Sequence, residues 1–181
     1  EIIKEEVEEA KYLKVGNGAS MALNPKNGEI LAMVGSRDFF ATSSATKKDK
    51  EFEGQFNVAT QGIRQPGSSI KPVTYATALD KGWTPASLIM DTKATFPNPG
   101  EKDYKPENYD RKFHGPVQLR FALGSSINIP TVKLLALVGV GNMLSTAYNM
   151  GISTLAPTNE NINRLGLSLT LGGGEVKLIE L

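Results

Sequence analysis

Two short apolar runs on either side of a tight turn constrain the fold most strongly. Residues 19–23 read Ala-Ser-Met-Ala-Leu, residues 29–34 read Glu-Ile-Leu-Ala-Met-Val, and between them residues 24–28 read Asn-Pro-Lys-Asn-Gly. An early proline and a late Asn-Gly are typical of a β-hairpin turn. Because both runs are almost continuously apolar, they predict strands that are covered on both faces. Two strands alone are only marginally stable, so this hairpin needs more sheet around it.

The remaining chain predicts mainly helices and loops. Residues 1–14 are charged and carry Ile3, Val7 and Ala10 at helical spacing. Further helices are expected at residues 68–81, 117–123, 130–139 and 142–150. Polar or proline-rich stretches predict loops at residues 37–56 and 84–116. No further convincing strand pair follows Val34, so either strands escape the pattern or the sheet is completed by residues outside 1–181. We favour the second explanation and expect an α/β (α+β) fold, an antiparallel sheet flanked by helices, that is incomplete within residues 1–181.

Charge and residue types exclude several classes of function. Twenty basic and nineteen acidic residues are interspersed and give a net charge of +1, so no basic surface for a nucleic acid is expected. The chain has no cysteine, and its single histidine, His114, disfavours both a metal site and a Ser-His-Asp triad. We expect neither a metal nor a cofactor. No run reaches the roughly 20 apolar residues of a membrane span, so any membrane anchor is expected outside this chain.

Ser68-Ser69-Ile70-Lys71 is the candidate nucleophile motif. Without cysteine and with one histidine, a serine nucleophile needs lysine as its base, and residues three apart share a helical face. Gln-Pro-Gly at residues 65–67 places Ser68 at a helix start, where backbone N–H groups can stabilise an oxyanion. A lysine in a dry cleft loses part of its preference for the charged form. The alternative is a serine cap followed by a solvated lysine.

Two further patterns bear on this motif. Ser44 and Lys47 have the same spacing, but they lie in a polar stretch with no helix to set their geometry, so we expect no role for them. Ser126 and Asn128 form the only Ser-x-Asn in the chain, just ahead of a predicted helix. Alone, that pattern is typical of helix capping. Beside the Ser-x-x-Lys motif, it supplies the second element of a serine acyltransferase that works without histidine.

Longer segments resemble class A penicillin-binding proteins, within the superfamily that includes serine β-lactamases. The segments similar to the family's active-site region are residues 56–61, 64–72, 104–109, 114–117, 122–123 and 126–130. Residues 22–34 are similar to the family's first two strands, and residues 167–172 and 175–176 match a stretch late in the domain. The resemblance therefore covers nearly the whole chain.

The resemblance implies a peptidoglycan D-Ala-D-Ala transpeptidase, which cross-links stem peptides in cell-wall synthesis and is acylated by β-lactam antibiotics. Carried over to this chain, Ser68 attacks the penultimate D-alanine carbonyl and becomes an acyl-enzyme, and its N–H forms half of the oxyanion hole. Lys71 takes the serine proton, and Ser126 relays it towards the leaving group. Asn128 holds the substrate backbone and helps to fix Lys71. The implied location is the extracytoplasmic face of the bacterial cell membrane, with the anchor and a glycosyltransferase domain upstream.

One part of the family pattern is missing. No lysine in the chain is followed by Thr-Gly or Ser-Gly, which form the family's third motif on an inner strand. We therefore expect residues 1–181 to be the N-terminal and central part of one transpeptidase domain, inactive alone, with the remainder supplied by further chain or by a second polypeptide. His114 and Trp83 are expected to be structural, and Glu107 receives no role.

Two alternatives remain open from the sequence. A serine β-lactamase shares the first two motifs, and it would release a penicillin adduct rapidly by hydrolysis. A non-catalytic β-lactam sensor would form the adduct but would not pass an acyl group to an amine. The intact set of Ser68, Lys71, Ser126 and Asn128 favours the transpeptidase over the sensor.

Overall fold

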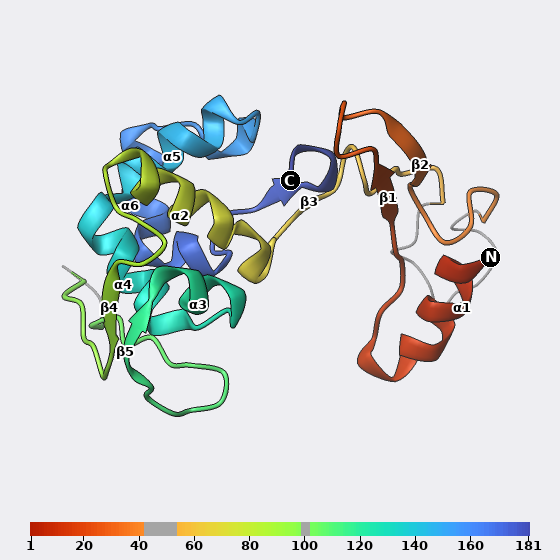
Figure 1. The fold of residues 1–181 in the computed structure, drawn as a ribbon. Helices are drawn as coiled ribbons and strands as arrows, with labels where there is room; N and C mark the ends of the chain where they lie inside the picture. The colour runs from red at the N-terminus through yellow and green to blue at the C-terminus, as the bar shows by residue number, and fades with distance from the viewer. Residues whose placement is uncertain (42–53, 99–101) are drawn as a thin grey trace. The chain divides into compact units, whose positions relative to one another are not determined.

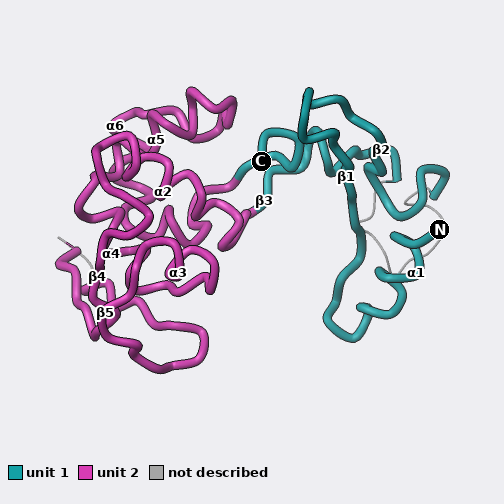
Figure 2. The backbone as a smooth tube through the Cα atoms, viewed as in Figure 1, with its two compact units in different colours: residues 1–64, 176–181 teal, residues 65–175 magenta. Residues whose placement is uncertain are grey.

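The computed structural model describes residues 1–41, 54–98 and 102–181, and the chain divides into two compact units (Figure 2). Unit 1 comprises Glu1–Arg64 and Val176–Leu181, and unit 2 comprises Gln65–Glu175. The elements of unit 1 are α1 (Ile2–Glu9), η1 (Ala10–Leu13), β1 (Ser20–Leu23), β2 (Ile30–Val34), β3 (Ile63–Arg64), β6 (Val176–Lys177) and η5 (Leu178–Glu180), where η denotes a 3₁₀ helix. The predicted pair Ser44 and Lys47 lies outside the described residues.

The elements of unit 2 are mostly helical (Figure 1). They are η2 (Gly67–Ile70), α2 (Lys71–Asp80), β4 (Leu88–Asp91), β5 (Gly115–Gln118), α3 (Leu119–Gly124), α4 (Asn128–Val138), α5 (Val140–Asn149), η3 (Ser153–Leu155), α6 (Asn159–Leu165) and η4 (Gly166–Leu171). The mixture of helices with small antiparallel sheets agrees with the predicted fold class.

The predicted hairpin is present in unit 1. β1 pairs antiparallel with β2, with Met21 opposite Met33, and a bulge interrupts the register after Ala22. The turn closes through a 2.8 Å hydrogen bond from the Gly28 N–H to the Asn24 carbonyl. Gly28 has φ of 75°, a left-handed conformation that glycine adopts without steric cost. The Asn-Gly signal therefore predicted the turn correctly.

The prediction that the hairpin is covered on both faces is wrong for the described residues. All five residues of β2 are exposed, including Leu31 at 63%. A continuous apolar run indicates a surface whose burial would be favourable, but it does not say which segment buries it.

The prediction that no strand pair follows Val34 is also wrong. β3 pairs antiparallel with β6, and β4 pairs antiparallel with β5. These strands are two to four residues long, too short for an alternating pattern to stand out. β5 also contains Pro116, and a proline argues against a strand in sequence analysis. Residues 117–118, predicted as the start of a helix, belong to this strand, and α3 begins only at Leu119.

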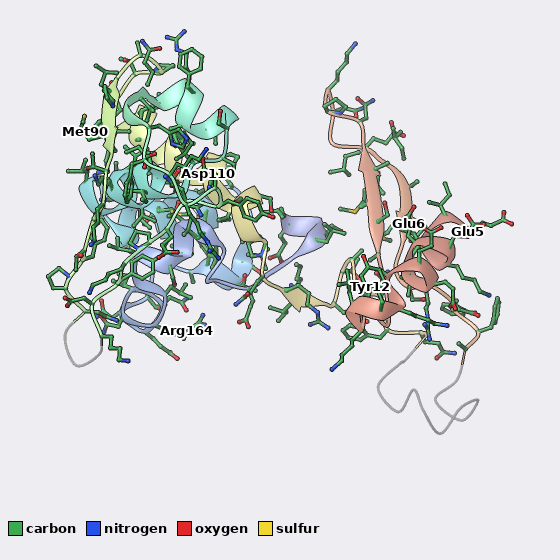
Figure 3. All side chains as sticks on the ribbon, turned by 90° about the horizontal axis from the view of Figure 1, so that it is seen from below. Glu5, Glu6, Tyr12, Met90, Asp110 and Arg164 are labelled. Atoms are coloured by element: carbon green, nitrogen blue, oxygen red, sulfur yellow. The ribbon has the colours of Figure 1, made fainter. Side chains whose placement is uncertain are left out.

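The N-terminal helix forms as predicted, although its last turn tightens into η1. Val7 is buried and Ile3 and Ala10 are half-buried, so the predicted apolar face is the one that packs. A Cβ on Gly18 would lie 3.1 Å from Val7 and 3.2 Å from Ile3, which shows how closely the following chain crosses this face. Glu5 and Glu6 project from α1 and are exposed (Figure 3).

The core of unit 2 is built from α2, α4, α5 and η4, with α4 in contact with both α2 and η4 (Figure 1). Buried apolar side chains from these elements include Val73, Ala78, Val132, Leu134, Leu135, Met143, Leu144 and Leu169. Two buried hydroxyl pairs join the same elements, Thr74 with Thr170 at 2.6 Å and Tyr75 with Thr131 at 3.0 Å. Helix α2 is therefore held on several sides, which gives its first residue a fixed position.

Helix α2 ends at the predicted glycine. Gly82 has φ of 88°, its N–H donates to the Leu79 carbonyl at 3.0 Å, and the Trp83 N–H donates to the Ala78 carbonyl at 3.1 Å. This pair of hydrogen bonds is a Schellman motif, which satisfies the last carbonyls of a helix. No single helix in the described ranges has the length and apolar composition to cross a membrane. Helices α4 and α5 meet that test only as a pair bent by 93°.

Candidate active site

Lys71 is the first residue of α2, and only 1% of it is exposed. Its Nζ donates to the Ser126 carbonyl at 2.6 Å, to Asn128 Oδ1 at 2.7 Å and to Ser126 Oγ at 3.1 Å. Three acceptors match the three N–H bonds of an ammonium group. The structure thus brings Lys71 together with both polar members of the Ser-x-Asn motif, across more than fifty residues of sequence. The sequence left open that Lys71 is solvated, and the structure rules this out because Lys71 is buried.

Burial lowers the pKa of Lys71 from 10.5 to about 8. Desolvation penalises the charged form of a lysine, so the neutral amine becomes accessible near neutral pH. A neutral amine has two N–H donors and one lone pair, which means that one of its three partners must then donate to it. Ser126 Oγ is the one partner of Lys71 that carries its own proton. The contact between these two groups can therefore pass a proton in either direction.

Ser126 reaches Lys71 because of the way α3 ends. The Ser126 N–H donates to the Leu123 carbonyl at 2.9 Å, and the Ile127 N–H donates to the Ala122 carbonyl at 2.9 Å. This Schellman motif requires a left-handed residue, and Ser126 takes that place with φ of 52°. The conformation costs a non-glycine residue about 1–2 kcal/mol. Glycine would adopt it freely but would bring no hydroxyl, so the strained residue is one whose side chain contacts Lys71.

Asn128 stands at the start of α4, and its carboxamide is held at both ends. Its Oδ1 accepts from Lys71, and its Nδ2 donates to the Glu107 carbonyl at 2.9 Å. Ser126 and Asn128 do not cap α4 with their side chains; its N-cap is Ile127, which has no side-chain hydrogen bond. The capping explanation of the Ser-x-Asn pattern therefore fails.

The cap of α4 comes from a distant loop. Asn108 Oδ1 accepts from the backbone N–H groups of Asn128 at 3.1 Å and Ile129 at 3.0 Å. Asn108 Nδ2 donates to both carboxylate oxygens of Asp91 at 2.9 Å. The roles of Asn108 and Asp91 in this cap were not predicted from the sequence. Asn108 had a signal only as part of the family-like segment 104–109, and the capping pattern pointed instead to Ser126 and Asn128.

Asp91, at the end of β4, is fully buried and is also paired with His114. Its Oδ2 accepts from the His114 N–H at 2.9 Å and lies 2.6 Å from His114 Nδ1, while His114 Nε2 lies 3.1 Å from Asp110. The hydrogen bond to Asp91 is the main cause that raises the pKa of His114, and Asp110 adds to it. The pKa of Asp110, labelled in Figure 3, is lowered chiefly by the backbone N–H of Lys112 and further by His114. These contacts agree with the structural role expected for His114.

Ser68 lies in η2, three residues before Lys71, and is exposed. With three residues per turn, a 3₁₀ helix places residues i and i+3 on the same side. Ser69 Oγ donates to the Pro66 carbonyl at 2.5 Å, whereas no hydrogen bond engages Ser68 Oγ within the described part of the chain. Ser68 is therefore not acting as a helix cap, and its side chain is accessible to a reactant from solvent.

A cavity of about 280 Å³ borders Ser126. The residues that line it are Asn108, Tyr109, Asp110, His114, Ser125, Ser126 and Ile127. A space of this size next to Ser126 can hold part of a peptide. Among the described residues, no group of three or more His, Asp or Glu side chains is arranged to hold a metal ion.

The turn before Ser68 contains Gly67, and the backbone of Gly172 packs against it. Gly67 has φ of 58° and Gly172 has φ of 93°. A Cβ on Gly172 would lie 2.3 Å from the Gly67 nitrogen and 2.4 Å from its Cα, which no real contact allows. The backbone at residue 172 therefore supports the turn that presents Ser68.

Replacing Gly172 with alanine tests this support. The methyl group would collide with the Gly67 backbone, so we expect Gly172→Ala to lower the free energy of unfolding by about 1–3 kcal/mol more than a matched control. Gly151→Ala is that control, since Gly151 also has a positive φ, 101°, but nothing lies within 4 Å of its added Cβ. Thermal unfolding of the two variants measures the difference. Equal losses would show that the close approach has no energetic consequence.

The comparisons with known proteins identify the family of the chain. The model of the penicillin-binding protein transpeptidase domain matches residues 18–166, and the chain belongs to that family. Penicillin-binding protein 1A of Aquifex aeolicus (strain VF5) is 38% identical over 165 residues, which cover 91% of this chain and 20% of that protein. The family predicted from the sequence is therefore confirmed. The chain spans only about a fifth of the length of this relative.

Solved structures give the same result. The crystal structure of penicillin-binding protein 1A from Haemophilus influenzae matches with a TM-score of 0.73 and 31% identity, covering 91% of this chain and 22% of that one. Penicillin-binding protein A from M. tuberculosis, solved as a ceftriaxone acyl-enzyme complex, matches with a TM-score of 0.70 and 26% identity, covering 90% of this chain and 43% of that one. The predicted fold class is thereby confirmed.

Proposed function

We propose that this chain supplies the nucleophile, the base and the proton relay of a peptidoglycan D-Ala-D-Ala transpeptidase. One observation carries the proposal: a buried lysine, three residues after an exposed serine at a helix start, is held by both members of a Ser-x-Asn motif. The substrates are the stem peptides of peptidoglycan, and β-lactams react at the same serine. The protein acts on the extracytoplasmic face of the bacterial cell membrane through an anchor outside these residues.

In the proposed reaction, Ser68 Oγ attacks the carbonyl carbon of the penultimate D-alanine. Neutral Lys71 accepts the Oγ proton as the O–C bond forms, and the Ser68 N–H at the start of η2 and α2 stabilises the oxyanion. Lys71 passes a proton through Ser126 Oγ to the departing nitrogen, the C–N bond breaks, and free D-alanine leaves. The amino group of a neighbouring stem peptide then attacks the ester carbonyl carbon, the C–Oγ bond breaks as the amide cross-link forms, and a proton from the attacking amine returns to Ser68 Oγ.

We further propose that residues 1–181 form the N-terminal and central part of one transpeptidase domain. A Lys-Thr-Gly strand, supplied by further chain or by a second polypeptide, completes the oxyanion hole and binds the substrate carboxylate. The 181-residue piece alone is then inactive. Tests of catalysis therefore use a polypeptide that contains this strand in addition to residues 1–181, termed the longer polypeptide.

The lowered pKa of Lys71 predicts how acylation depends on pH. The acylation rate constant for benzylpenicillin should follow the neutral fraction of Lys71, rising about 50-fold from pH 6 to pH 8 and levelling above a midpoint near 8. Stopped-flow kinetics of the longer polypeptide at saturating benzylpenicillin measure this profile. A flat profile between pH 6 and pH 9 would contradict Lys71 as the base.

The fate of the acyl-enzyme separates the proposed function from its alternatives. The longer polypeptide is incubated with benzylpenicillin and, separately, with a donor pentapeptide and an amine acceptor. A transpeptidase keeps the penicillin adduct for many minutes and joins the donor to the acceptor with release of D-alanine. Rapid turnover of benzylpenicillin would indicate a β-lactamase, and a stable adduct without transfer to the acceptor would indicate a sensor.

A further inference from the structure

The side-chain amide of Asn108 joins the first turn of α4 to a buried carboxylate. Its Oδ1 accepts from the Asn128 and Ile129 N–H groups at 3.1 and 3.0 Å. Its Nδ2 donates to both oxygens of Asp91 at 2.9 Å and to the Lys112 carbonyl at 2.7 Å. Turning the amide over would set oxygen against the carboxylate and N–H against N–H. Asn108, only 5% exposed, is therefore fixed in one orientation.

The same loop also orients the Asn128 side chain. The carbonyl of Glu107, one residue before Asn108, accepts from Asn128 Nδ2 at 2.9 Å. This contact leaves Asn128 Oδ1 to face Lys71 at 2.7 Å. One dipeptide, residues 107–108, thus fixes both the backbone and the side chain of Asn128. No group with a net charge is ion-paired with Lys71 among the described residues, so Asn128 and Ser126 are the partners that hold its ammonium group.

Asp91 gives this loop a fixed anchor. A fully buried carboxylate is costly unless it is paired and hydrogen-bonded. Asp91 is fully buried, and it accepts hydrogen bonds from the side-chain amide of Asn108 and from the backbone N–H of His114. His114 Nδ1 lies 2.6 Å from the same carboxylate. The charged groups that face His114 are Asp91 and Asp110. The contacts therefore run from a surface ion pair through Asp91 and Asn108 to the start of α4.

We propose that Asn108 is a positioning residue for the acylation step: anchored on Asp91, it fixes the start of α4 so that Asn128 Oδ1 stays on Lys71. The inference rests on the proposed function of Ser68 and Lys71, but it concerns Asn108, which is hydrogen-bonded to the start of α4. Asn108 is not itself a catalytic residue, since it acts only through Asn128.

Three variants of the longer polypeptide test the proposal. Asn108→Ala removes the link, and Asn108→Asp keeps an acceptor for α4 but sets a second carboxylate against Asp91. The double variant Asp91→Asn, Asn108→Asp exchanges the two groups and restores a donor opposite an acceptor. We expect each single variant to lower the benzylpenicillin acylation rate constant about 10- to 100-fold, because small misplacements of catalytic groups have effects of this size. The dissociation constant of the complex that precedes acylation should stay within about threefold, and the double variant should recover most of the rate.

A matched control separates positioning from loss of stability. Tyr75→Phe removes the buried hydrogen bond to Thr131, which joins the same helices α2 and α4 one turn beyond Lys71 and Asn128. It should lower the thermal unfolding temperature and leave the acylation rate constant unchanged. If Tyr75→Phe slows acylation as much as Asn108→Ala does, or if the exchanged pair recovers nothing, the positioning role is wrong.

A measurement that does not need acylation decides the same question. In the longer polypeptide labelled with ¹⁵N-asparagine, hydrogen exchange of the Asn128 side-chain amide reports how firmly that group is held. We expect faster exchange in Asn108→Ala than in the unsubstituted protein, and equal exchange would overturn the proposal. If benzylpenicillin does not acylate the unsubstituted protein at Ser68, the proposed function fails, while the exchange rates still give the answer for Asn108.

Discussion

Replacing Ser68 with alanine is expected to abolish covalent labelling by benzylpenicillin, with a loss of at least about 10³-fold in the acylation rate constant. Ser68 Oγ is the atom that forms the ester bond, so no neighbouring group can substitute for it. Because Ser68 is exposed and its hydroxyl makes no hydrogen bond in the described structure, stability should change by less than about 0.5 kcal/mol. Labelling with fluorescent penicillin and thermal unfolding of the longer polypeptide measure the two effects.

Ser69→Ala is the control for this prediction. Ser69 is adjacent and exposed, but its hydroxyl donates to the Pro66 carbonyl. We expect this variant to keep labelling within a fewfold of the unsubstituted protein. Loss of labelling in Ser69→Ala with retention in Ser68→Ala would reassign the nucleophile. Retention in both would remove the motif from the mechanism.

Replacing Lys71 with methionine is expected to slow acylation while stabilising the fold. Loss of a general base lowers the rate by about 10²- to 10⁴-fold. The fall in the pKa of Lys71 from 10.5 to about 8 means that holding it charged costs roughly 3 kcal/mol at pH 7. Methionine removes that cost. Water can reach the freed acceptors, because Ser126 is exposed and Asn128 is half-buried, so we expect a net gain of about 1 kcal/mol.

The stability gain should itself depend on pH. Between about 8 and 10.5, the unfolded chain binds a proton at Lys71 that the folded protein has already released, so the unsubstituted protein becomes more stable as pH rises through this window. The advantage of Lys71→Met should therefore be largest below pH 8 and should reverse before pH 10.5, because the roughly 3 kcal/mol that the unsubstituted protein regains exceeds the gain of about 1 kcal/mol. Denaturant unfolding at pH 7 and pH 10 measures it. Lys133→Met is the control, since Lys133 is also hydrogen-bonded, to Met90 and Thr92, but lies away from the site. A loss of stability in Lys71→Met at pH 7 would show that the hydrogen bonds of Lys71 outweigh its burial.

The parts of the fold that sequence analysis predicted correctly are those with local signals. The hairpin followed from its turn residues, and α2 followed from the Pro-Gly break before it and Gly82 after it. The missed strands β4 and β5 owe their pairing to contacts between residues 88–91 and 115–118, which leave little trace in short segments. The hairpin was predicted to be covered on both faces, and within the described residues it is not. An apolar run indicates that burial would be favourable, but it does not identify the segment that would cover it.

The candidate site likewise divides into residues with a local sequence signal and residues without one. The motif pattern singled out Lys71, Ser126 and Asn128, because spacing within a motif is a local property, and the structure brings the three together. The roles of Asp91 and Asn108 could not be predicted, since each depends on hydrogen bonds between segments far apart in sequence. The strain at Ser126 was equally hidden, because it depends on how the chain ends α3, and a serine does not signal a left-handed residue as a glycine does.

The intact mass of the longer polypeptide with and without benzylpenicillin, followed by peptide mapping, tests the assignment of Ser68 as the nucleophile most directly. We expect one adduct with the mass of one penicillin, located on the peptide that contains Ser68 and absent in Ser68→Ala. No adduct on a folded polypeptide that includes the Lys-Thr-Gly strand, or an adduct on a different serine, would contradict the assignment.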